Sequence, residues 1–418
     1  MANNNENKVL NVPHLRFPEF NGEWEKCKIS DLLDFYSTNS LSWEQLEYDT
    51  NAMMNLHYGL IHVGLPTMID LAKDKLPNIK EGNMPKNFEM CKEGDVAFAD
   101  ASEDTNEVAK TIEFYNLAEK NVVCGLHTIH GRDNKHKTIV GFKGYAFLSA
   151  AFHNQIRRIA QGTKIYSIST KNFSECYIGL PSKPEQTKIA TLLRLIDERI
   201  ATQNKIIEKL QSLIKGLNDN IHKGIKGETV CFSDLGEAYS GLSGKGGDDF
   251  GYGEPFITYM NVYQNTYISE KDYELVQIAP NEKQNSVQYG DALFTLSSET
   301  PEEVGIGAVY LGNTQKLYLN SFCFGIHFYD ERVLPQYLAH FISSSSFRRA
   351  IYPLAQGSTR FNLQKNDFMK MKFLLPSLEK QGHIANTLDA LHCRLANEKS
   401  LTEQYILLKK YLLSLMFI

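Results

Sequence analysis

The sequence predicts an α/β fold in which two similar α/β domains are separated by a pair of long antiparallel helices, a pseudo-two-fold duplicated arrangement. Two observations predict it. A long heptad pattern occupies the middle of the chain, and both this pattern and the domain before it recur about 195 residues later. Because two copies are too few for a solenoid, we interpret the repeat as a duplicated globular unit followed by a helix.

The heptad pattern predicts one helix over residues 185–222, and Pro184 suits the start of such a helix. Its length is roughly 57 Å at the helical rise per residue. An isolated helix of this length is not stable by propensity alone, so its apolar stripe needs a partner helix. The stripe consists of Ile189, Leu193, Ile196, Ile200, Gln203, Ile207, Leu210, Ile214, Leu217 and Ile221.

The second copy supplies that partner. The segment 160–163 (Ala-Gln-Gly-Thr) recurs at 355–358, Leu-Pro-Ser at 180–182 recurs at 375–377, and Ile-Ala at 189–190 recurs at 384–385. We therefore predict four parts: a globular domain over 1–182, a spacer helix over 183–222, a second globular domain over 223–377 and a second spacer helix over 378–418.

Connectivity predicts that the two helices run antiparallel, since the second domain then joins neighbouring helix ends by short connections. Placing Gln203 opposite Glu398 pairs apolar layers along the rod, among them Leu193 with Leu408 and Ile196 with Tyr405. A buried polar pair can fix the register of two helices. Cysteines at positions 203 and 398 should then cross-link within one chain, which needs Cα atoms within about 7 Å. The predicted interface comprises Ile189, Leu193, Ile196, Ile200, Gln203, Leu210, Leu213, Leu217, Ile384, Leu388, Leu391, Leu395, Glu398, Leu401 and Leu412.

The composition is that of an ordinary globular protein, with 42% apolar and 22% charged residues among 418. Seven scattered cysteines without a C-x-x-C pair argue for a reducing compartment and against a disulfide framework or a zinc site. The polar N-terminus predicts disorder over residues 1–12 and no signal peptide. No apolar run approaches the ~20 residues of a membrane span. We expect a cytoplasmic protein without a membrane partner.

Positive charge gathers at equivalent places in the two repeats although the net charge is −5. Residues 132–171 hold eight basic and one acidic residue, and residues 332–372 hold seven and one. One such segment is readily a solvated face, whereas two matched segments favour a footprint for phosphate. A competing interpretation is that some of these residues fix a domain to its helix. The candidate DNA-contacting residues are Arg157, Arg158, Lys164, Arg348, Arg349 and Arg360.

Motifs for catalysis and metal binding are missing. The glycine-rich stretch 240–253 lacks the spacing of a phosphate-binding P-loop, and the sequence contains no H-E-x-x-H, no G-x-S-x-G and no Pro-Pro dipeptide. The last absence excludes the Asn/Asp-Pro-Pro-Tyr/Phe loop of amino-methyltransferases. His127 and His130 are interpreted as ordinary core or surface histidines. We therefore assign no catalytic residue and no metal ligand.

The repeated halves, the helix starts that combine Leu-Pro-Ser with Gln and Ile-Ala, and the Gly-Ser/Thr tracts together resemble the specificity subunit of a type I restriction–modification system. The resemblance extends from about Trp24 to Phe417, with one departure at Lys380, which interrupts the second Glu-Gln pair. It implies that each globular domain is a target-recognition domain that reads one half of a bipartite sequence in double-stranded DNA. The helices would set the gap between the two half-sites.

The resemblance also implies partners. Two modification subunits would bring S-adenosylmethionine and methylate adenine, while restriction subunits with ATP and Mg would translocate and cleave DNA. This chain would be non-catalytic and hold no cofactor of its own. Two alternatives remain: an enzyme with an unrecognised active site, opposed by the duplication and the missing motifs, and a coiled-coil adaptor without a DNA role, opposed by the matched basic segments.

Overall fold

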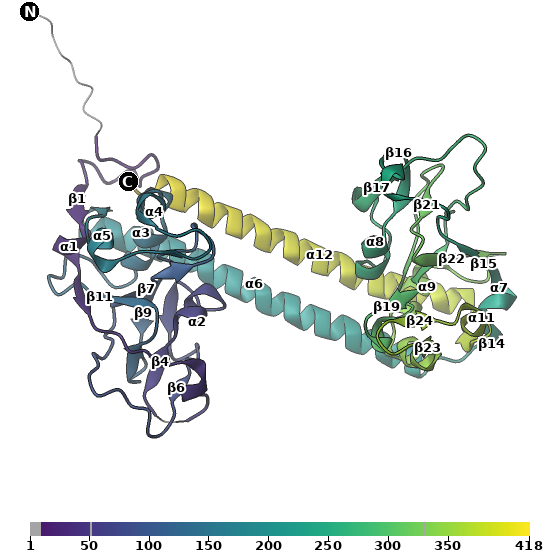
Figure 1. The fold of residues 1–418 in the computed structure, drawn as a ribbon, viewed down its shortest axis with the longest axis horizontal. Helices are drawn as coiled ribbons and strands as arrows, with labels where there is room; N and C mark the ends of the chain where they lie inside the picture. The colour runs from purple at the N-terminus through teal and green to yellow at the C-terminus, as the bar shows by residue number, and fades with distance from the viewer. Residues whose placement is uncertain (1–9, 51, 330) are drawn as a thin grey trace, which may run out of the picture. The chain divides into compact units, whose positions relative to one another are not determined.

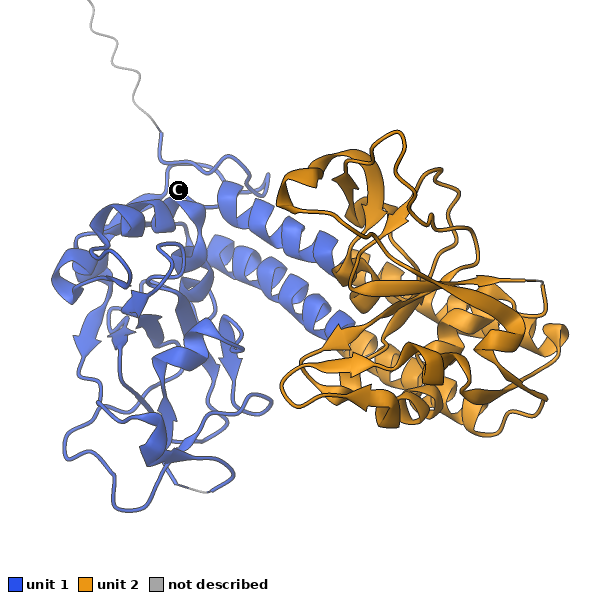
Figure 2. Ribbon diagram, turned by 45° about the vertical axis from the view of Figure 1, so that its right-hand side comes forward, with its two compact units in different colours: residues 1–204, 401–418 blue, residues 205–400 orange. Residues whose placement is uncertain are grey.

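The structure, a computed structural model, describes residues 10–50, 52–329 and 331–418 and divides into two compact units (Figure 2). Unit 1 consists of residues 1–204 and 401–418, and unit 2 of residues 205–400. Each unit therefore combines one α/β domain with parts of both long helices. Of the segment predicted to be disordered, residues 1–9 lie outside the described residues.

The domain of unit 1 is built on two mixed sheets. A five-stranded sheet has the order β2-β11-β7-β9-β5, and a four-stranded sheet has the order β10-β4-β6-β3. The strands are β1 Glu25–Lys28, β2 Asp34–Tyr36, β3 Leu46–Glu47, β4 Met54–Leu56, β5 Met68–Asp70, β6 Asn78–Ile79, β7 Val96–Ala99, β8 Ala101–Ser102, β9 Thr111–Asn116, β10 Val122–Cys124, β11 Thr128–Arg132, β12 Tyr166–Ser167 and β13 Tyr177–Leu180. The helices are α1 Ile29–Leu32, η1 Trp43–Gln45, α2 Tyr58–His62, α3 Lys143–Leu148, α4 Ala150–Ile159 and α5 Thr170–Ser174.

The domain of unit 2 repeats this plan with a four-stranded sheet, β15-β22-β18-β20, and a three-stranded sheet, β17-β16-β21. The strands are β14 Glu228–Cys231, β15 Gly236–Ser240, β16 Phe250–Ile257, β17 Tyr273–Val276, β18 Ala292–Thr295, β19 Ser297–Ser298, β20 Gly307–Val309, β21 Tyr318–Leu319, β22 Cys323–Phe328, β23 Ala355–Gln356, β24 Phe361–Leu363 and β25 Lys372–Leu375. The helices are α7 Phe232–Leu235, α8 Tyr259–Gln264, η2 Gly247–Asp249, η3 Glu270–Asp272, η4 Pro301–Glu303, α9 Pro335–Ile342, α10 Ser345–Ile351, η5 Tyr352–Leu354 and α11 Lys365–Met369.

A buried glutamine near the start of each long helix shows the duplication at atomic detail. The side-chain amide of Gln186 donates to the carbonyl oxygens of Lys137 and Pro181, at 3.2 and 3.0 Å, and its oxygen accepts from the backbone N–H of Ile139 at 3.0 Å. Gln381 makes the same three bonds to Arg332, Pro376 and Leu334, at 2.8, 2.9 and 2.7 Å. Each glutamine satisfies three backbone groups of its own domain, so it fixes the domain to the helix.

The two long helices are α6, Lys183–Lys223, and α12, Leu378–Leu415 (Figure 1). In unit 1, Ile189 and Leu193 near the start of α6 share a buried cluster with Leu412 near the end of α12. In unit 2, Leu217 near the end of α6 packs against the cluster that holds Ile384 at the start of α12. The helices are therefore antiparallel within each unit, which confirms the predicted direction.

Two residues placed in the helix interface from sequence lie on the solvent side instead. Leu213 is 53% exposed, while its neighbour Ile214 is 7% exposed. Leu401 is 37% exposed, while Thr402 is 7% exposed. A shift of one residue turns a side chain by about 100° around a helix, so the prediction that Leu213 and Leu401 lie in the helix interface is wrong.

Leu408, predicted to lie opposite Leu193, is likewise 43% exposed. Every other predicted interface position is buried or half-buried. Gln203 and Glu398, which define the predicted register, are 4% and 5% exposed. Their mutual contact stays a prediction.

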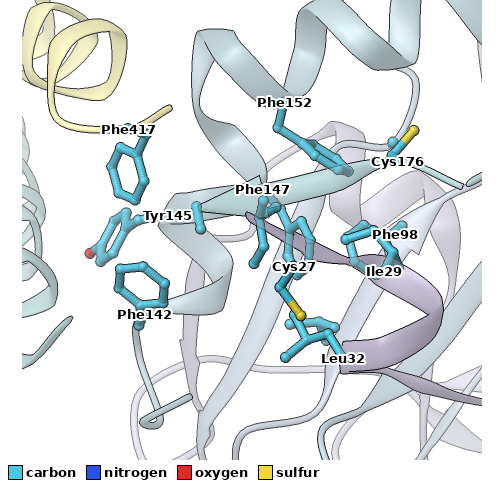
Figure 3. Close-up of a cluster of buried hydrophobic side chains, with 14 of the residues drawn as sticks. Cys27, Ile29, Leu32, Phe98, Phe142, Tyr145, Phe147, Phe152, Cys176 and Phe417 are labelled. Atoms are coloured by element: carbon cyan, nitrogen blue, oxygen red, sulfur yellow. The ribbon is translucent and has the colours of Figure 1, made fainter. Parts of the chain in front are cut away.

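The core of unit 1 runs from the five-stranded sheet to the helix pair. Phe98 of β7 lies edge-on to Phe147 and Phe173, at ring-centroid distances of 4.9 and 4.6 Å. At the other end of this cluster Phe417 lies beside Phe142 and Tyr145 (Figure 3). The domain and the end of α12 thus share one continuous apolar core.

Within the described residues, no helix is long and apolar enough to cross a membrane.

Candidate nucleic-acid interface

Each domain presents an exposed hairpin built from the repeated Gln-Gly-Thr/Ser segment. The first hairpin, residues 160–167, closes with two backbone hydrogen bonds between Gln161 and Ser167, of 2.9 and 2.8 Å. The second hairpin, residues 355–363, closes through the pairing of β23 with β24. The glycines, Gly162 and Gly357, both have φ of 144°, and a Cβ atom on either would collide with a carbonyl oxygen across the turn. Glycine is therefore required here, and both turns have the same backbone.

A short helix leads into each hairpin and carries candidate basic residues. Ser149 caps α4 by accepting from the N–H of Phe152, and Ser344 caps α10 by accepting from that of Phe347. In the first domain Arg157 and Arg158 lie in the last turn of α4 and are exposed, and so is Lys164 in the hairpin. Arg157 donates to the side-chain oxygen of Asn106 at 2.8 Å. The structure thus brings the three basic residues of the first half onto one continuous helix–hairpin segment.

In the second domain the adjacent arginines of α10 differ. Arg349 is exposed. The guanidinium of Arg348 donates to the carbonyl oxygens of Glu302, Val304 and Gly305, at 2.7, 2.6 and 2.7 Å. Arg348 therefore holds the η4 segment against α10 within the second domain. We remove it from the candidate DNA contacts.

Arg360 lies in the second hairpin beside a hollow that the sequence did not predict. Its Nε donates to Ser297 Oγ at 3.2 Å, and its guanidinium carbon is 5.4 Å from the centre of the Phe322 ring. The hollow has a volume of about 770 Å³ and is lined by Tyr259, Met260, Tyr263, Ser297, Ser298, Glu299, Glu303, Thr359 and Arg360. Hydroxyl, carboxylate and guanidinium groups next to aromatic rings are suited to hydrogen bonding with base edges, whereas the two carboxylates disfavour a phosphate.

The aromatic part of this hollow has a counterpart in the first domain. Tyr259 and Tyr263 of α8 stack with ring centroids 6.0 Å apart, and the Tyr259 hydroxyl donates to the carbonyl oxygen of Ser297 at 2.9 Å. In α2, Tyr58 and His62 have the same four-residue spacing, and His62 Nε2 lies 2.9 Å from the carbonyl oxygen of Ala101. In the sequence, only the four-residue spacing of these rings could have indicated the aromatic part of the hollow.

Comparisons with known proteins agree with this architecture. A family model described as the type I restriction modification DNA specificity domain matches residues 122–212 and 227–404, more than half of the chain. The specificity subunit of the type I restriction enzyme EcoKI from Escherichia coli (strain K12) is 23% identical over 338 residues, which cover 74% of this chain and 70% of that protein.

Two solved structures share the fold. The S subunit of a type I restriction–modification system from M. genitalium matches with a TM-score of 0.53 at 14% identity, covering 97% of this chain and 99% of that one. A chain from a study of complex assembly and conformational transition in the type I R-M system matches with a TM-score of 0.60 at 15% identity, covering 96% and 98%. With the family model matching in both halves of a duplicated α/β chain, this protein belongs to the family of type I restriction–modification specificity subunits.

Proposed function

We propose that this chain reads a bipartite DNA target, each domain contacting one half-site through its helix–hairpin segment. The observation that carries the proposal is the duplication of that segment with an identical glycine turn and different exposed side chains. The first hairpin offers Lys164 where the second offers Thr359 and Arg360. A fixed backbone with variable tips suits two readers of the same construction that recognise different bases.

The long helices have a separate role in the proposal, which is to hold the two readers at a fixed spacing and to bind partner subunits. On α12, Leu407 and Tyr411 are 64% and 58% exposed and lie four residues apart, and Leu408, 43% exposed, lies three residues from Tyr411, so the three side chains are neighbours on the helix surface. A contiguous apolar stripe on a water-exposed helix is typical of a surface that binds another protein. The modification subunits of the family are the partners we propose for it.

The chemistry is assigned to those partners. Modification subunits would bind S-adenosylmethionine and methylate adenine, and restriction subunits would use ATP and Mg to translocate and cleave DNA. In this proposal the chain contributes recognition and no catalytic residue. Its basic side chains on the helix–hairpin segments bind and orient DNA.

A domain exchange tests the proposal. The chain is produced together with modification subunits, residues 1–180 are replaced by those of a homologue, and methylated adenines are mapped across a genome. We expect one half of the recognised sequence to change and the other half and the gap to stay. The matched control exchanges residues 223–377 and should change only the other half-site. An unchanged methylation pattern in both exchanges would support the adaptor alternative, and a change in both halves from one exchange would contradict two independent readers.

A further inference from the structure

A cluster of potential metal ligands lies buried in the first domain, away from the hairpin. Cys91 precedes β7, Cys124 ends β10, and His130 lies in β11. The two sulfur atoms are 3.5 Å apart, and one donor atom from each of the three residues lies within 4.8 Å of the others. The residues are 6%, 2% and 0% exposed. Two thiols and an imidazole therefore converge on one buried point.

The histidine is oriented as a metal ligand is. Its Nε2 lies 2.7 Å from an oxygen of Asp95, while Nδ1 is buried without a hydrogen-bond partner. A buried polar atom without a partner is rare and calls for an explanation. Metal-bound histidines commonly hydrogen-bond a carboxylate through the ring nitrogen that does not bind the metal.

The charges around the cluster suit a divalent cation. Two thiolates neutralise a divalent ion, and the carboxylate of Asp95 is already balanced by Arg132, whose Nη2 lies 2.8 Å from it. Sulfur and imidazole ligands select zinc among the common divalent ions. The separation of the two sulfurs is close to that expected across a tetrahedral zinc with Zn–S bonds of about 2.3 Å.

The second domain shows that the fold does not need the two thiols. The backbone bond from Cys91 N–H to Val122 O, 2.8 Å, corresponds to that from Val287 N–H to Leu317 O, 2.7 Å. Val287 and Leu319 thus replace the two cysteines and are buried in an apolar cluster.

A tyrosine, Tyr239, takes the place of His130 in the second domain, and its hydroxyl donates to Asp291 at 2.7 Å. His130 pairs with Ala97 in β7, and Gly325 pairs with Leu293 at the corresponding point of β18. A Cβ atom on Gly325 would overlap the ring of Tyr239, which fills this space.

We propose that the first domain binds one zinc ion through Cys91, Cys124 and His130. No further His, Cys, Asp or Glu of the described chain belongs to the group, which leaves the fourth position to water or another small ligand. Cys124 belongs to the four-stranded sheet and His130 to the five-stranded sheet. The ion would therefore tie the two sheets of this domain together. The sequence argued against zinc because the ligands do not form a C-x-x-C pair, but the fold supplies the proximity that the spacing lacks.

Metal analysis of the purified full-length chain tests the proposal. We expect about one zinc ion per chain after dialysis, and a Cys91→Val, Cys124→Leu variant, which copies the second domain, should hold none. The control is Cys176→Ser, a buried cysteine of the same unit outside the cluster, which should keep its zinc. Circular dichroism establishes that each variant is folded.

Cobalt substitution gives a second readout that does not depend on the variants. Wild-type chain stripped of metal and loaded with Co²⁺ should show thiolate-to-cobalt absorption in the near ultraviolet and the intense visible bands of a tetrahedral site. A wild-type chain that holds no zinc and gives no such spectrum overturns the proposal. So does a non-reduced wild-type chain in which mass spectrometry finds Cys91 and Cys124 joined as a disulfide.

Discussion

The two units differ at the junction between the domain and the long helices. In unit 1, Phe417 lies against Phe142 with ring centroids 5.9 Å apart. At the equivalent place in unit 2, His222 lies against Tyr337 with ring centroids 5.6 Å apart. One turn away in unit 1, the Tyr145 hydroxyl donates to Asp197 at 2.8 Å. The positions equivalent to these two are His340 and His392 in unit 2, whose rings stack at 5.4 Å. The same backbone junction is thus mainly aromatic and acidic in one unit and rich in histidine in the other.

The difference teaches which contacts the duplicated fold needs. Gln186 and Gln381 bind backbone groups, and these bonds are the same in both units. The ring contacts include no backbone bond that the two units share: His222 Nδ1 lies 2.9 Å from the carbonyl oxygen of Asn218 and His340 Nε2 lies 2.8 Å from Asp389, whereas Phe142 and Phe417 have no polar side-chain atom. A ring can therefore be exchanged for another of similar volume without moving the backbone. In unit 2 this exchange places ionisable groups, the imidazoles of His222, His340 and His392, at the buried junction.

The largest expected effect follows from those histidines. Burial lowers the pKa of His222, of His340 and of His392; for His340 it outweighs the hydrogen bond to the Asp389 carboxylate, which raises the pKa. The unfolded chain therefore binds protons first as the pH falls. The three histidines contribute their full stabilisation above about pH 6.5, the pKa of a histidine in the unfolded chain. This stabilisation is lost as the pH falls from there toward the lower pKa of each histidine in the folded chain. The loss amounts to at most about 1.4 kcal/mol per pH unit for each histidine.

Hydrogen exchange at about pH 7.5 and about pH 5.5 measures this effect. After correction for the intrinsic exchange rate, we expect α9 and the end of α6 to lose protection at the lower pH, while α3 and the end of α12 keep theirs. A His222→Phe, His340→Tyr variant, which copies unit 1, should lose most of the pH dependence. Equal protection of α9 at both pH values would contradict the assignment.

A smaller effect is expected from the glutamines that the junctions share. Gln186→Ala and Gln381→Ala each leave two carbonyl groups and one N–H group without a partner in a buried place. The expected cost is about 1–3 kcal/mol in the free energy of unfolding for each variant. Urea denaturation of both variants tests it, with Gln211→Ala on the exposed side of α6 as the control. A neutral Gln381→Ala beside a damaging Gln186→Ala would show that the two anchors are not equivalent.

The parts of the fold that were predictable depend on long patterns. The α6 stripe extends over many heptads, so a few ambiguous residues do not obscure it, and the repeat is marked by residues with backbone roles, such as Gly162 and Gly357. The antiparallel direction followed from chain connectivity alone. The face of α12 that packs on α6 could not be predicted exactly, because Leu401, Leu407 and Leu408 place apolar residues on more than one side of the helix.

Contacts between residues far apart in the sequence could not be predicted. Arg348 and Arg349 are adjacent residues of the same type, so the sequence does not distinguish their roles. The structure does, because the carbonyl groups at η4 bind Arg348. The cluster of Cys91, Cys124 and His130 depends on the pairing of strands from two sheets. In each case the local pattern gives the residue type, whereas tertiary packing decides what that residue contacts.

The smallest expected effect separates those two arginines. Arg349→Ala should weaken DNA binding a few-fold and reduce the salt slope of the affinity by about one, because one exposed phosphate contact is lost. Arg157→Ala should do the same from the first domain. Arg348→Ala should leave the salt slope unchanged and lower the stability of unit 2, since three carbonyl groups lose their donor. Binding is measured by titration of a DNA duplex with the target at several salt concentrations, in the presence of modification subunits. If Arg348→Ala reduced the slope while Arg349→Ala did not, the assignment of the two arginines would have to be reversed.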